Sequence, residues 1–411
     1  MFVWDKDALN DQQVDAIQQT SNVFLDACPG SGKTRTLTYK IALELSKLTD
    51  EKKWIVAITY TNRAADEIRD RIELLGVETS QLWIGTIHAF CLEWIIKPYG
   101  IYHDKLKNGF KVINSYDSEE IITNICFRLR PQQYITYYQC SHFYTPRGLN
   151  ITGGGGSLAT SVLETYHQHL DDNHQIDFEQ ILYFSYQLLF NRATISKILS
   201  NLFSYFFIDE YQDTFPMVVE IMLSYLKQSG KKCIIGFFGD AMQCIYDKGI
   251  GDLNAYKYDG NKGEVFEVQK LQNRRNPQMV IDLANKIRTD GLMQVPSGDV
   301  KAPNMRNGQI KDGQCLFLYT QKDGDVLSLV RSYLSEEKQW NFHDAKATKE
   351  LNLTHNLIAG KAGFSTLMEI YSGDLLLKYI KGGKLQTCVQ SNISDEEMSE
   401  MTFGEILKAL C

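Results

Sequence analysis

The sequence predicts an α/β protein built on a parallel β-sheet that is covered by helices on both faces. Strands are expected where short apolar runs occur, at residues 23–26, 54–59, 203–208 and 233–238. Two helices are expected over 32–47 and 62–75, because apolar residues there recur every three or four positions. Apolar strands that alternate with helices are typical of a parallel sheet with two buried faces.

Residues 100–195 predict a helical insertion in the first α/β domain. The region is rich in tyrosine, shows helical apolar spacing and contains no further strong strand. Its glycine run TGGGGS, at 152–157, is expected to form a flexible loop. The first domain is therefore expected to comprise residues 1–99 and 196–262.

A second, incomplete α/β domain is expected over residues 263–371. Its expected elements are a strand at 264–268, a helix at 277–289, and strands at 315–319 and 351–354. Residues 372–411 are expected to be helical and to begin a further insertion.

Composition narrows the class of protein. A chain of 411 residues is long for one core, and 44% hydrophobic with 23% charged residues is typical of a globular protein. No apolar run is long enough for a membrane span, and Asp5 and Asp7 stand where a signal peptide would need basic and apolar residues. Nine cysteines without a CxxC pair argue against a zinc ribbon, an iron–sulfur site or a disulfide framework. We therefore expect a cytoplasmic protein without membrane contact.

The net charge of −7, from 43 basic and 50 acidic residues, bears on nucleic-acid binding. A protein that holds nucleic acid through its global field is usually basic. Any such role here must therefore rest on a local groove.

The stretch ACPGSGKT, at residues 27–34, predicts a phosphate-binding loop. It lies between an expected strand and an expected helix, where Pro29-Gly30-Ser31-Gly32 lets successive backbone N–H groups point at a phosphate. Lys33 would add a positive charge for the β- and γ-phosphates, and Thr34 a hydroxyl for Mg²⁺. Ala27 stands where the usual pattern has glycine. The alternative is a glycine-rich turn that happens to precede Lys-Thr.

Two further strand ends carry polar residues that suit a nucleotide. Asp209 and Glu210 follow the strand at 203–208; Asp209 would hold Mg²⁺ through its water shell, and Glu210 would polarise the attacking water. Gln243 follows the strand at 233–238 and would bond the γ-phosphate and report its loss. The alternatives are a solvated loop start and an ordinary Gly-Asp turn.

Seven motifs in order across residues 9–285 resemble those of the UvrD/Rep-type DNA helicases. They are LNDQQVDAI (9–17), ACPGSGKTRTL (27–37), AITYTNRAADEIRDRI (57–72), GTIHAFC (85–91), FFIDEYQDT (206–214), GFFGDAMQCIY (236–246) and LQNRRNPQMVIDLAN (271–285). The resemblance implies two RecA-like domains that close on ATP and Mg²⁺ and open after hydrolysis. The first would be the P-loop domain, and the second would be incomplete in this sequence.

The resemblance also implies roles at the nucleotide. Gln13 would read the adenine edge, Arg35 is the arginine that follows the phosphate loop, and Arg275 would touch the γ-phosphate from the second domain. Arg274 stands where the family has a tyrosine that stacks on adenine. A guanidinium can also lie on a purine face.

The resemblance further implies that a single DNA strand crosses both domains. Tyr60 and Asn62 would stack on it and hydrogen-bond to it, while Thr86 and His88 would touch its backbone. Stacking suits a motor because every base has a π-face. The alternative for Tyr60 and His88 is ordinary packing at a strand end. His88 has no partner at metal-ligand spacing.

The chain departs from the family in its second half. After Tyr246 it reads Asp247-Lys248-Gly249, where the family has an aromatic residue and an arginine. The family's T.H..KG.E and V..TRA segments are absent from the sequence, and residues 350–364 resemble the strand and helix before its large insertion. The 411 residues are therefore expected to bind ATP but to hydrolyse it poorly. Either the sequence is a truncated product, or a partner chain completes the site.

Two functions are consistent with these features. The first is an ATP-dependent DNA helicase or translocase, in repair or in defence against foreign DNA. The DEYQD form also resembles, more loosely, the helicase-like subunit of Gabija anti-phage systems, which accompanies a nuclease. The alternative is a regulatory subunit that senses ATP or DNA and gates a partner nuclease without unwinding.

Overall fold

The computed structural model describes residues 9–129, 134–226, 233–245, 249–260, 262–319, 321, 326–344 and 346–351. It forms two compact units, Met1–Cys315 and Leu316–Cys411. Within the described residues, no helix has both the length and the hydropathy that a bilayer crossing requires.

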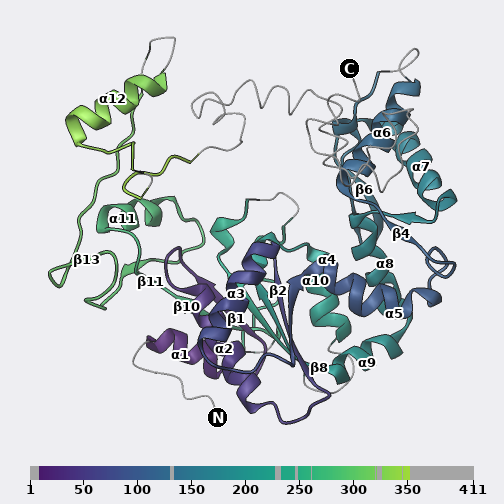
Figure 1. The fold of residues 1–411 in the computed structure, drawn as a ribbon, viewed down its shortest axis with the longest axis horizontal. Coiled ribbons are helices and arrows are strands. Elements are labelled where there is room, and N and C mark those ends of the chain that lie inside the picture. Colours follow the sequence, from purple (N-terminus) through teal and green to yellow (C-terminus); the bar gives the residue numbers. More distant parts are fainter. Residues whose placement is uncertain are drawn as a thin grey trace, which may run out of the picture. The chain divides into compact units, whose positions relative to one another are not determined.

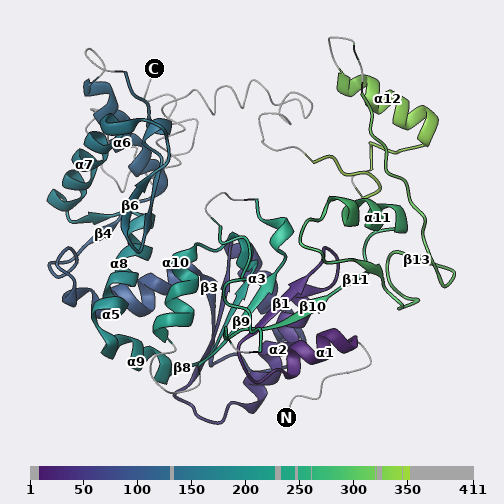
Figure 2. The same cartoon turned by 180° about the vertical axis from the view of Figure 1, so that it is seen from behind.

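A six-stranded parallel sheet forms the centre of the first unit, with the strand order β10-β1-β9-β8-β2-β3 (Figures 1 and 2). Its strands are β1 (Val23–Ala27), β2 (Trp54–Thr59), β3 (Leu82–Thr86), β8 (Phe203–Asp209), β9 (Ile234–Gly239) and β10 (Phe266–Lys270). Every neighbouring pair runs parallel. The predicted fold class, a RecA-like α/β domain on a parallel sheet, is confirmed.

The two faces of the sheet are covered by different helices, which explains why its strands are apolar throughout. On one face, Leu25, Ile55 and Phe207 pack with α2 (Lys33–Lys47) and α3 (Asn62–Leu74). The sequence neighbours of these three residues face the other side of the sheet; they are Phe24, Val56 and Phe206. They belong to a second core cluster, which extends into α8 (Phe178–Asn191) and α10 (Pro216–Glu220). The expected helices at 32–47 and 62–75 are thus present.

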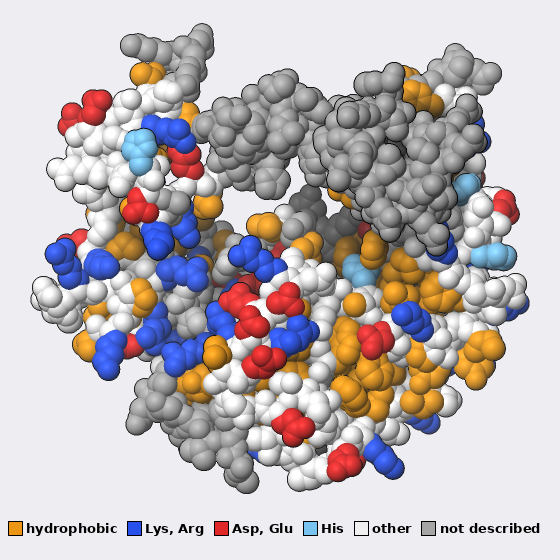
Figure 3. All heavy atoms as spheres, viewed as in Figure 1, with side chains coloured by type: hydrophobic (Ala, Val, Ile, Leu, Met, Phe, Trp, Pro, Cys, Tyr) orange, Lys and Arg blue, Asp and Glu red, His pale blue; other side chains and the backbone are white. Residues whose placement is uncertain are grey.

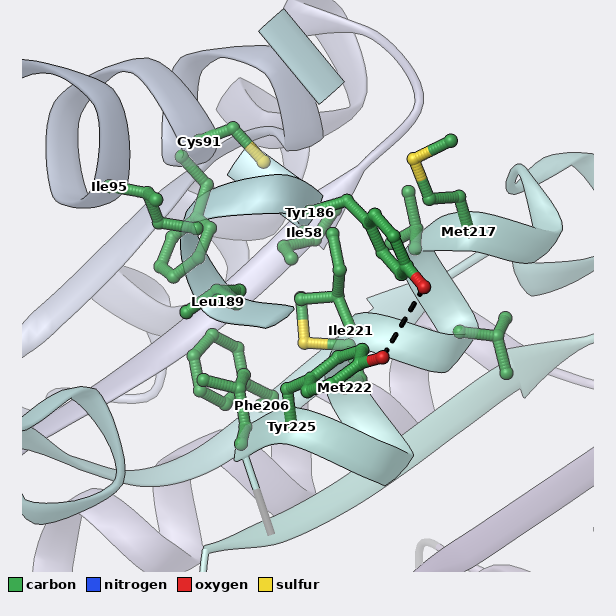
Figure 4. Close-up of a cluster of buried hydrophobic side chains, with 14 of the residues drawn as sticks. Ile58, Cys91, Ile95, Tyr186, Leu189, Phe206, Met217, Ile221, Met222 and Tyr225 are labelled. Atoms are coloured by element: carbon green, nitrogen blue, oxygen red, sulfur yellow. Dashed lines mark hydrogen bonds between the residues drawn. The ribbon is translucent and has the colours of Figure 1, made fainter. Parts of the chain in front are cut away.

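Figure 4 shows part of this second cluster, where Ile58 and Phe206 of the sheet meet side chains of α8 and of the helical turns after α10. Tyr186 and Tyr225 lie within it and share a hydrogen bond of 3.3 Å between their hydroxyl groups. Each hydroxyl thereby satisfies the other inside an apolar core.

The insertion is mainly helical, as expected. Its long helices are α6 (Ser115–Leu129), α7 (Gly156–Asp172) and α8, with an antiparallel hairpin of β5 (His142–Thr145) and β6 (Gly148–Ile151). Two of the four glycines in the run 153–156 pack against Gln139, and the flexibility expected of this loop stays a prediction. A Cβ on Gly153 would lie 2.4 Å from the backbone of Gln139, and the amide of Gly155 donates to the carbonyl of Gln139.

Shorter elements complete the first unit. They are α1 (Asp11–Gln18), α4 (Ile87–Phe90), α5 (Lys97–Tyr99), α9 (Ala193–Leu202), α11 (Gln278–Ile287), β4 (Lys111–Val112) paired with β7 (Gln175–Ile176), β11 (Gln272–Asn273) with β12 (Val295–Pro296), and β13 (Met305–Arg306) with β14 (Gln309–Ile310). In the second unit, α12 (Val326–Lys338) buries Leu334, whose carbonyl accepts from the amide of Trp340.

Two strand predictions need correction, and one strand of the sheet was not predicted. The strand expected at 264–268 to open a second α/β domain instead joins the first sheet as β10, with Phe266 opposite Val23. β3 was not predicted, because its residues LWIGT are interrupted by glycine and half-exposed. Residues 315–319 form no strand, and Phe317 and Tyr319 are exposed.

The remaining expectations for the second half stay predictions. Apart from Leu351, the strand at 351–354 and the helical segment at 372–411 lie outside the described residues. The division at residues 99, 195, 262 and 371 is likewise untested.

A buried lysine joins α1 to α2. Lys40, on α2, donates to the carbonyls of Ile17 and Gln19 at the end of α1, at 2.8 and 2.5 Å, and to Oε1 of Glu44 at 3.0 Å. A cation at a helix C-terminus satisfies carbonyls that have no partner within the helix. Lys40 therefore fixes the helix that carries Gln13.

We predict that Lys40→Met lowers the free energy of unfolding by about 3–5 kcal/mol, because it leaves the buried Glu44 without its main partner. Lys47→Met is the matched control: Lys47 also pairs with Glu44 but is 48% exposed, so it should cost less than about 1 kcal/mol. Urea unfolding of both variants measures the difference, and equal losses would contradict the role of Lys40.

Candidate functional site

The strand order brings three polar loops together at one edge of the sheet. The carboxyl ends of β1, β9 and β8 are neighbours, and they lead into the glycine loop at 28–32, into Asp240 and into Glu210. In parallel sheets, ligands bind in the crevice outside the carboxyl ends of the strands. The same edge therefore holds the three sets of residues that the sequence singled out for a nucleotide.

The glycine loop has a backbone shape that other residues rarely adopt. Gly30 and Gly32 have φ of +73° and +92°, and Gly32 is the N-cap of α2. A Cβ on Gly30 would lie 2.6 Å from Cβ of Arg275, and the amide of Arg274 donates to the carbonyl of Gly30. The segment 273–275 thus packs directly on the loop, and Gly30 is required both for its conformation and for this contact.

A pocket of about 460 Å³ opens at this loop, and we call it the loop pocket. It is lined by Gln13, Cys28, Pro29, Gly30, Ser31, Gly32, Lys33, Thr34, Arg35, Arg71, Glu210, Gln243, Arg274, Arg275 and Pro303. All the predicted nucleotide residues except Asp209 are in this set. The structure therefore places together residues that lie up to 262 positions apart.

Lys33 and Glu210 meet in the loop pocket. Nζ of Lys33 donates to Oε2 of Glu210 at 2.9 Å, and the same oxygen accepts from Nε2 of Gln212 at 2.9 Å. Glu210 has φ of 48°, a left-handed conformation that is uncommon for residues other than glycine. Such strain often marks a functional position.

Asp209 lies behind Glu210 at the end of β8, with 7% of its surface exposed. Burial, and next to it the charge of Glu210, raise the pKa of Asp209 to about 7. Among the described residues, no group donates to its Oδ1, and Oγ of Ser31 in the glycine loop is also buried without a partner. One unsatisfied oxygen in the glycine loop and another at the end of β8, where the charge of Lys33 acts on Asp209, fit a bound phosphate and cation.

Gln243 reaches the loop pocket from the end of β9. Its Nε2 donates to Oδ2 of Asp240 at 2.7 Å, and the amide of Asp240 donates to Oε1 of Gln212 at 3.2 Å. Asp240 thus contacts the loops after β9 and β8, the first through its carboxylate and the second through its backbone amide.

A second pocket, of about 600 Å³, adjoins the loop pocket and shares Gln13, Arg35 and Arg274 with it. The amide of Gln13 is engaged on both sides, since Nε2 donates to Thr36 at 3.0 Å and Oε1 accepts from the amide of Asn10. The guanidinium of Arg274 pairs with Asp299. Arg35 lies over the ring of Tyr39 at 5.7 Å.

The four residues expected to contact DNA lie at the other end of the same sheet edge. β2 and β3 are neighbours, with Thr59 opposite Thr86, so Tyr60 and Asn62 follow one strand and His88 follows the other. Tyr60 is 46% exposed. Thr86 caps α4, its hydroxyl oxygen accepting from the amide of Ala89 at 3.3 Å.

His88 is half-buried, and burial lowers its pKa to about 4, so it is neutral near pH 7. Its ring lies edge-on against Phe178, at 5.5 Å between centroids. Phe178 begins α8, so the insertion contributes to this part of the sheet edge.

Sequence reasoning missed three contributors. Arg71 lines the loop pocket, and its only signal was its place at the end of the motif over 57–72. Asp240 looked like an ordinary turn residue. Phe178 carried no signal, because its position beside His88 depends on tertiary packing.

The site combines a strand, a loop with two left-handed glycines and a helix that begins at lysine. They meet where the carboxyl ends of a parallel sheet lie. This arrangement defines a RecA-like P-loop domain. The UvrD/REP helicase N-terminal domain family model matches residues 9–256, more than half of the chain. The chain belongs to this family.

Individual relatives agree with that assignment. The Gabija protein GajB of Bacillus cereus (strain HuB5-5) is 25% identical over 456 residues, which cover 96% of this chain and 63% of GajB. The ATP-dependent DNA helicase PcrA of Staphylococcus epidermidis is 25% identical over 304 residues, covering 71% of this chain and 41% of PcrA. The chain therefore spans less than two thirds of the length of these relatives.

A further buried acid lies under the glycine loop. Asp26, on β1, is 6% exposed, and no described group donates to its Oδ1. Burial, followed by the neighbouring Asp240, raises the pKa of Asp26 to about 6. Because the folded protein holds this proton more tightly than the unfolded chain, ionising Asp26 destabilises the fold as pH rises from about 4 to 6.

We predict that Asp26→Asn raises the free energy of unfolding by about 2 kcal/mol at pH 8 relative to the native chain, and that the gain disappears near pH 4. Asp66→Asn, at an exposed position of α3, should show no such pH-dependent difference. Urea unfolding at several pH values measures both, and a gain that grows toward low pH would contradict the assignment.

Proposed function

We propose that this chain is the motor core of an ATP-dependent translocase on single-stranded DNA. The observation that carries the proposal is the convergence of Lys33, Glu210, Gln243 and Arg275 on one glycine loop, within a pocket of about 460 Å³. No simple structural role requires two basic groups, a strained glutamate and an amide to face the same space. A triphosphate bound there would pair with the two basic groups and the amide, and the glutamate would face the attacking water.

At the phosphate end, the glycine loop and Lys33 would hold the β- and γ-phosphates, with Arg71 and Arg275 adding positive charge. Thr34 and Asp209 would hold Mg²⁺, which neutralises charge on the phosphates during transfer. Glu210 would orient and deprotonate the attacking water, once phosphate oxygens replace it as the partner of Lys33. Gln243 would bond the γ-phosphate.

At the base end, Gln13, Arg35 and Arg274 would bind the nucleoside, since they line both pockets. Arg274 is held by Asp299 and could present its flat guanidinium to the base. Gln13 would need to exchange its contact with Thr36 or use its second N–H to read a base edge.

DNA would lie along the β2 and β3 end of the sheet edge, with Tyr60, Asn62, Thr86 and His88 in contact with it. The neutral state of His88 favours a hydrogen bond to the backbone over a charge contact. Basic side chains gather over the α11 to β13 region in Figure 3, at the nucleotide end of the sheet edge and not over β2 and β3, although the net charge is −7. A local positive surface of this kind supports a phosphate-bearing ligand.

A second candidate is a nucleotide-dependent subunit that gates a partner nuclease without unwinding DNA, as part of an anti-phage system. The match with the Gabija protein over 96% of the chain favours it. Both candidates require ATP to bind in the loop pocket. They differ in whether DNA accelerates turnover.

We predict that DNA stimulates ATP hydrolysis and that Lys33→Ala abolishes this hydrolysis by weakening nucleotide binding.

Glu210→Gln should keep ATP bound but slow turnover by about 100-fold or more, because the phosphate contacts remain while the water loses its base. Arg275→Ala should slow hydrolysis more than it weakens binding. Arg147→Ala, at an exposed position in the turn between β5 and β6, is the control. Binding without any DNA-stimulated turnover would favour the gating subunit.

We predict that Tyr60→Ala weakens binding of a single-stranded oligonucleotide by about tenfold or more, through loss of one stacked base. Tyr102→Ala is the control, since Tyr102 is 59% exposed but lies away from β2 and β3. Fluorescence anisotropy at fixed salt measures both affinities. Equal effects of the two substitutions would argue against a DNA contact at Tyr60.

A further inference from the structure

We infer that Arg288 is a positioning residue for the γ-phosphate end of the loop pocket: it fixes Asp240, and through Asp240 it sets the side chains of Gln243 and Gln212. The inference rests on the proposed nucleotide site. Arg288 itself does not line the loop pocket and would not touch the nucleotide.

Arg288 binds Asp240 through two parallel contacts. Its two terminal nitrogens donate to Oδ2 and Oδ1 of Asp240 at 3.1 and 2.9 Å. Nε and one terminal nitrogen also donate to Asp290, at 3.0 and 2.5 Å. A planar guanidinium held by two carboxylates has one orientation, so the carboxylate of Asp240 is fixed as well.

Asp240 holds one glutamine through this carboxylate and a second glutamine through its backbone amide. Its Oδ2 accepts from Nε2 of Gln243 at 2.7 Å, which leaves the second N–H of that amide for a phosphate oxygen. Its backbone amide donates to Oε1 of Gln212, whose Nε2 donates to Glu210. The groups proposed to sense the γ-phosphate and to activate water are therefore connected to one guanidinium.

Stability alone does not account for the pair. The side chains of Arg288 and Asp240 are 5% and 0% exposed. Removing both charges from water costs about as much as their attraction returns, and an apolar pair of similar size is often at least as stable. A buried bidentate pair is therefore better explained by the geometry that it imposes.

The position of Arg288 in the chain lets the Arg288–Asp240 pair connect two segments of the site. Arg288 directly follows α11, and the residues before α11 carry Arg275 and pack on Gly30. The pair thus ties the segment that supplies Arg275 to the strand that supplies Gln243. Both γ-phosphate contacts would be set together, so the site should distinguish a triphosphate from a diphosphate.

The test is the preference for triphosphate, measured as the ratio of the Kd for ADP to the Kd for a non-hydrolysable ATP analogue, both with Mg²⁺. Arg288→Lys keeps the charge but loses the two parallel contacts, so we expect the ratio and kcat each to fall about tenfold, while ADP affinity changes less than about twofold. Arg147→Lys, the same substitution at an exposed site in the turn between β5 and β6, should change nothing.

A double variant separates positioning from general damage. If Arg288 acts through Gln243, Gln243→Ala should lower the ratio similarly, and adding Arg288→Lys to it should cause little further loss. Unchanged ratios in Arg288→Lys, additive losses, or an equal loss of ADP affinity would each overturn the inference. If Arg288→Lys unfolds at a much lower temperature than the native chain, Asp290→Asn is the variant to test, because it removes only one of the two carboxylates that hold Arg288. We expect Asp290→Asn to lower the ratio by a smaller factor. An unchanged ratio in that variant would overturn the inference.

The two levels of the proposal fail differently. A native chain that binds neither nucleotide would refute the nucleotide site itself. If the native chain prefers the triphosphate and Arg288→Lys shows the same ratio of the two Kd values, only the role of Arg288 is refuted.

Discussion

The hydrogen-bonded order β1-β9-β8 at the centre of the sheet is the constraint on which the site depends. Parallel pairing sets Asp26 opposite Gly239 and Phe238 opposite Asp209, so three strands end at the same level. A shift of one residue in any of them would turn its side chains to the other face. The alignment of the glycine loop with Asp209 is therefore a result of backbone pairing, and the two-sided apolar core maintains that pairing.

Acids crowd this edge, and the structure opposes each of them with a specific basic group or leaves it partly protonated. Glu210 meets Lys33, and Asp240 meets Arg288. Asp209 has no basic partner in hydrogen-bond contact among the described residues, and burial raises its pKa to about 7. Charges held out of water in this way respond strongly to an arriving phosphate or cation, because little solvent screens them. Like charges crowded together in this way are typical of sites built for a charged ligand.

Much of the first domain followed from local pattern. The apolar runs that became β1, β2, β8 and β9 are buried on both faces, and such strands are readable without knowledge of their neighbours. β3 was missed because glycine and partial exposure dilute its apolar signal. β10 was recognised as a strand but placed in the wrong sheet, since its residues do not encode which edge it joins. Residues 315–319 have a strand's composition without a strand in the structure, because pairing depends on a neighbour.

The sequence by itself determined the chemistry available: a glycine loop whose shape glycine alone adopts easily, a lysine and threonine at the start of a helix, and acids after buried strands. These are local properties, set by backbone sterics and by spacing of a few residues. Only the tertiary structure decided that Arg275 packs against Gly30, that Arg288 holds Asp240, and that Phe178 meets His88. Such contacts join residues tens to hundreds of positions apart, and they arise from the packing of the whole sheet and its helices, which no short stretch of sequence contains.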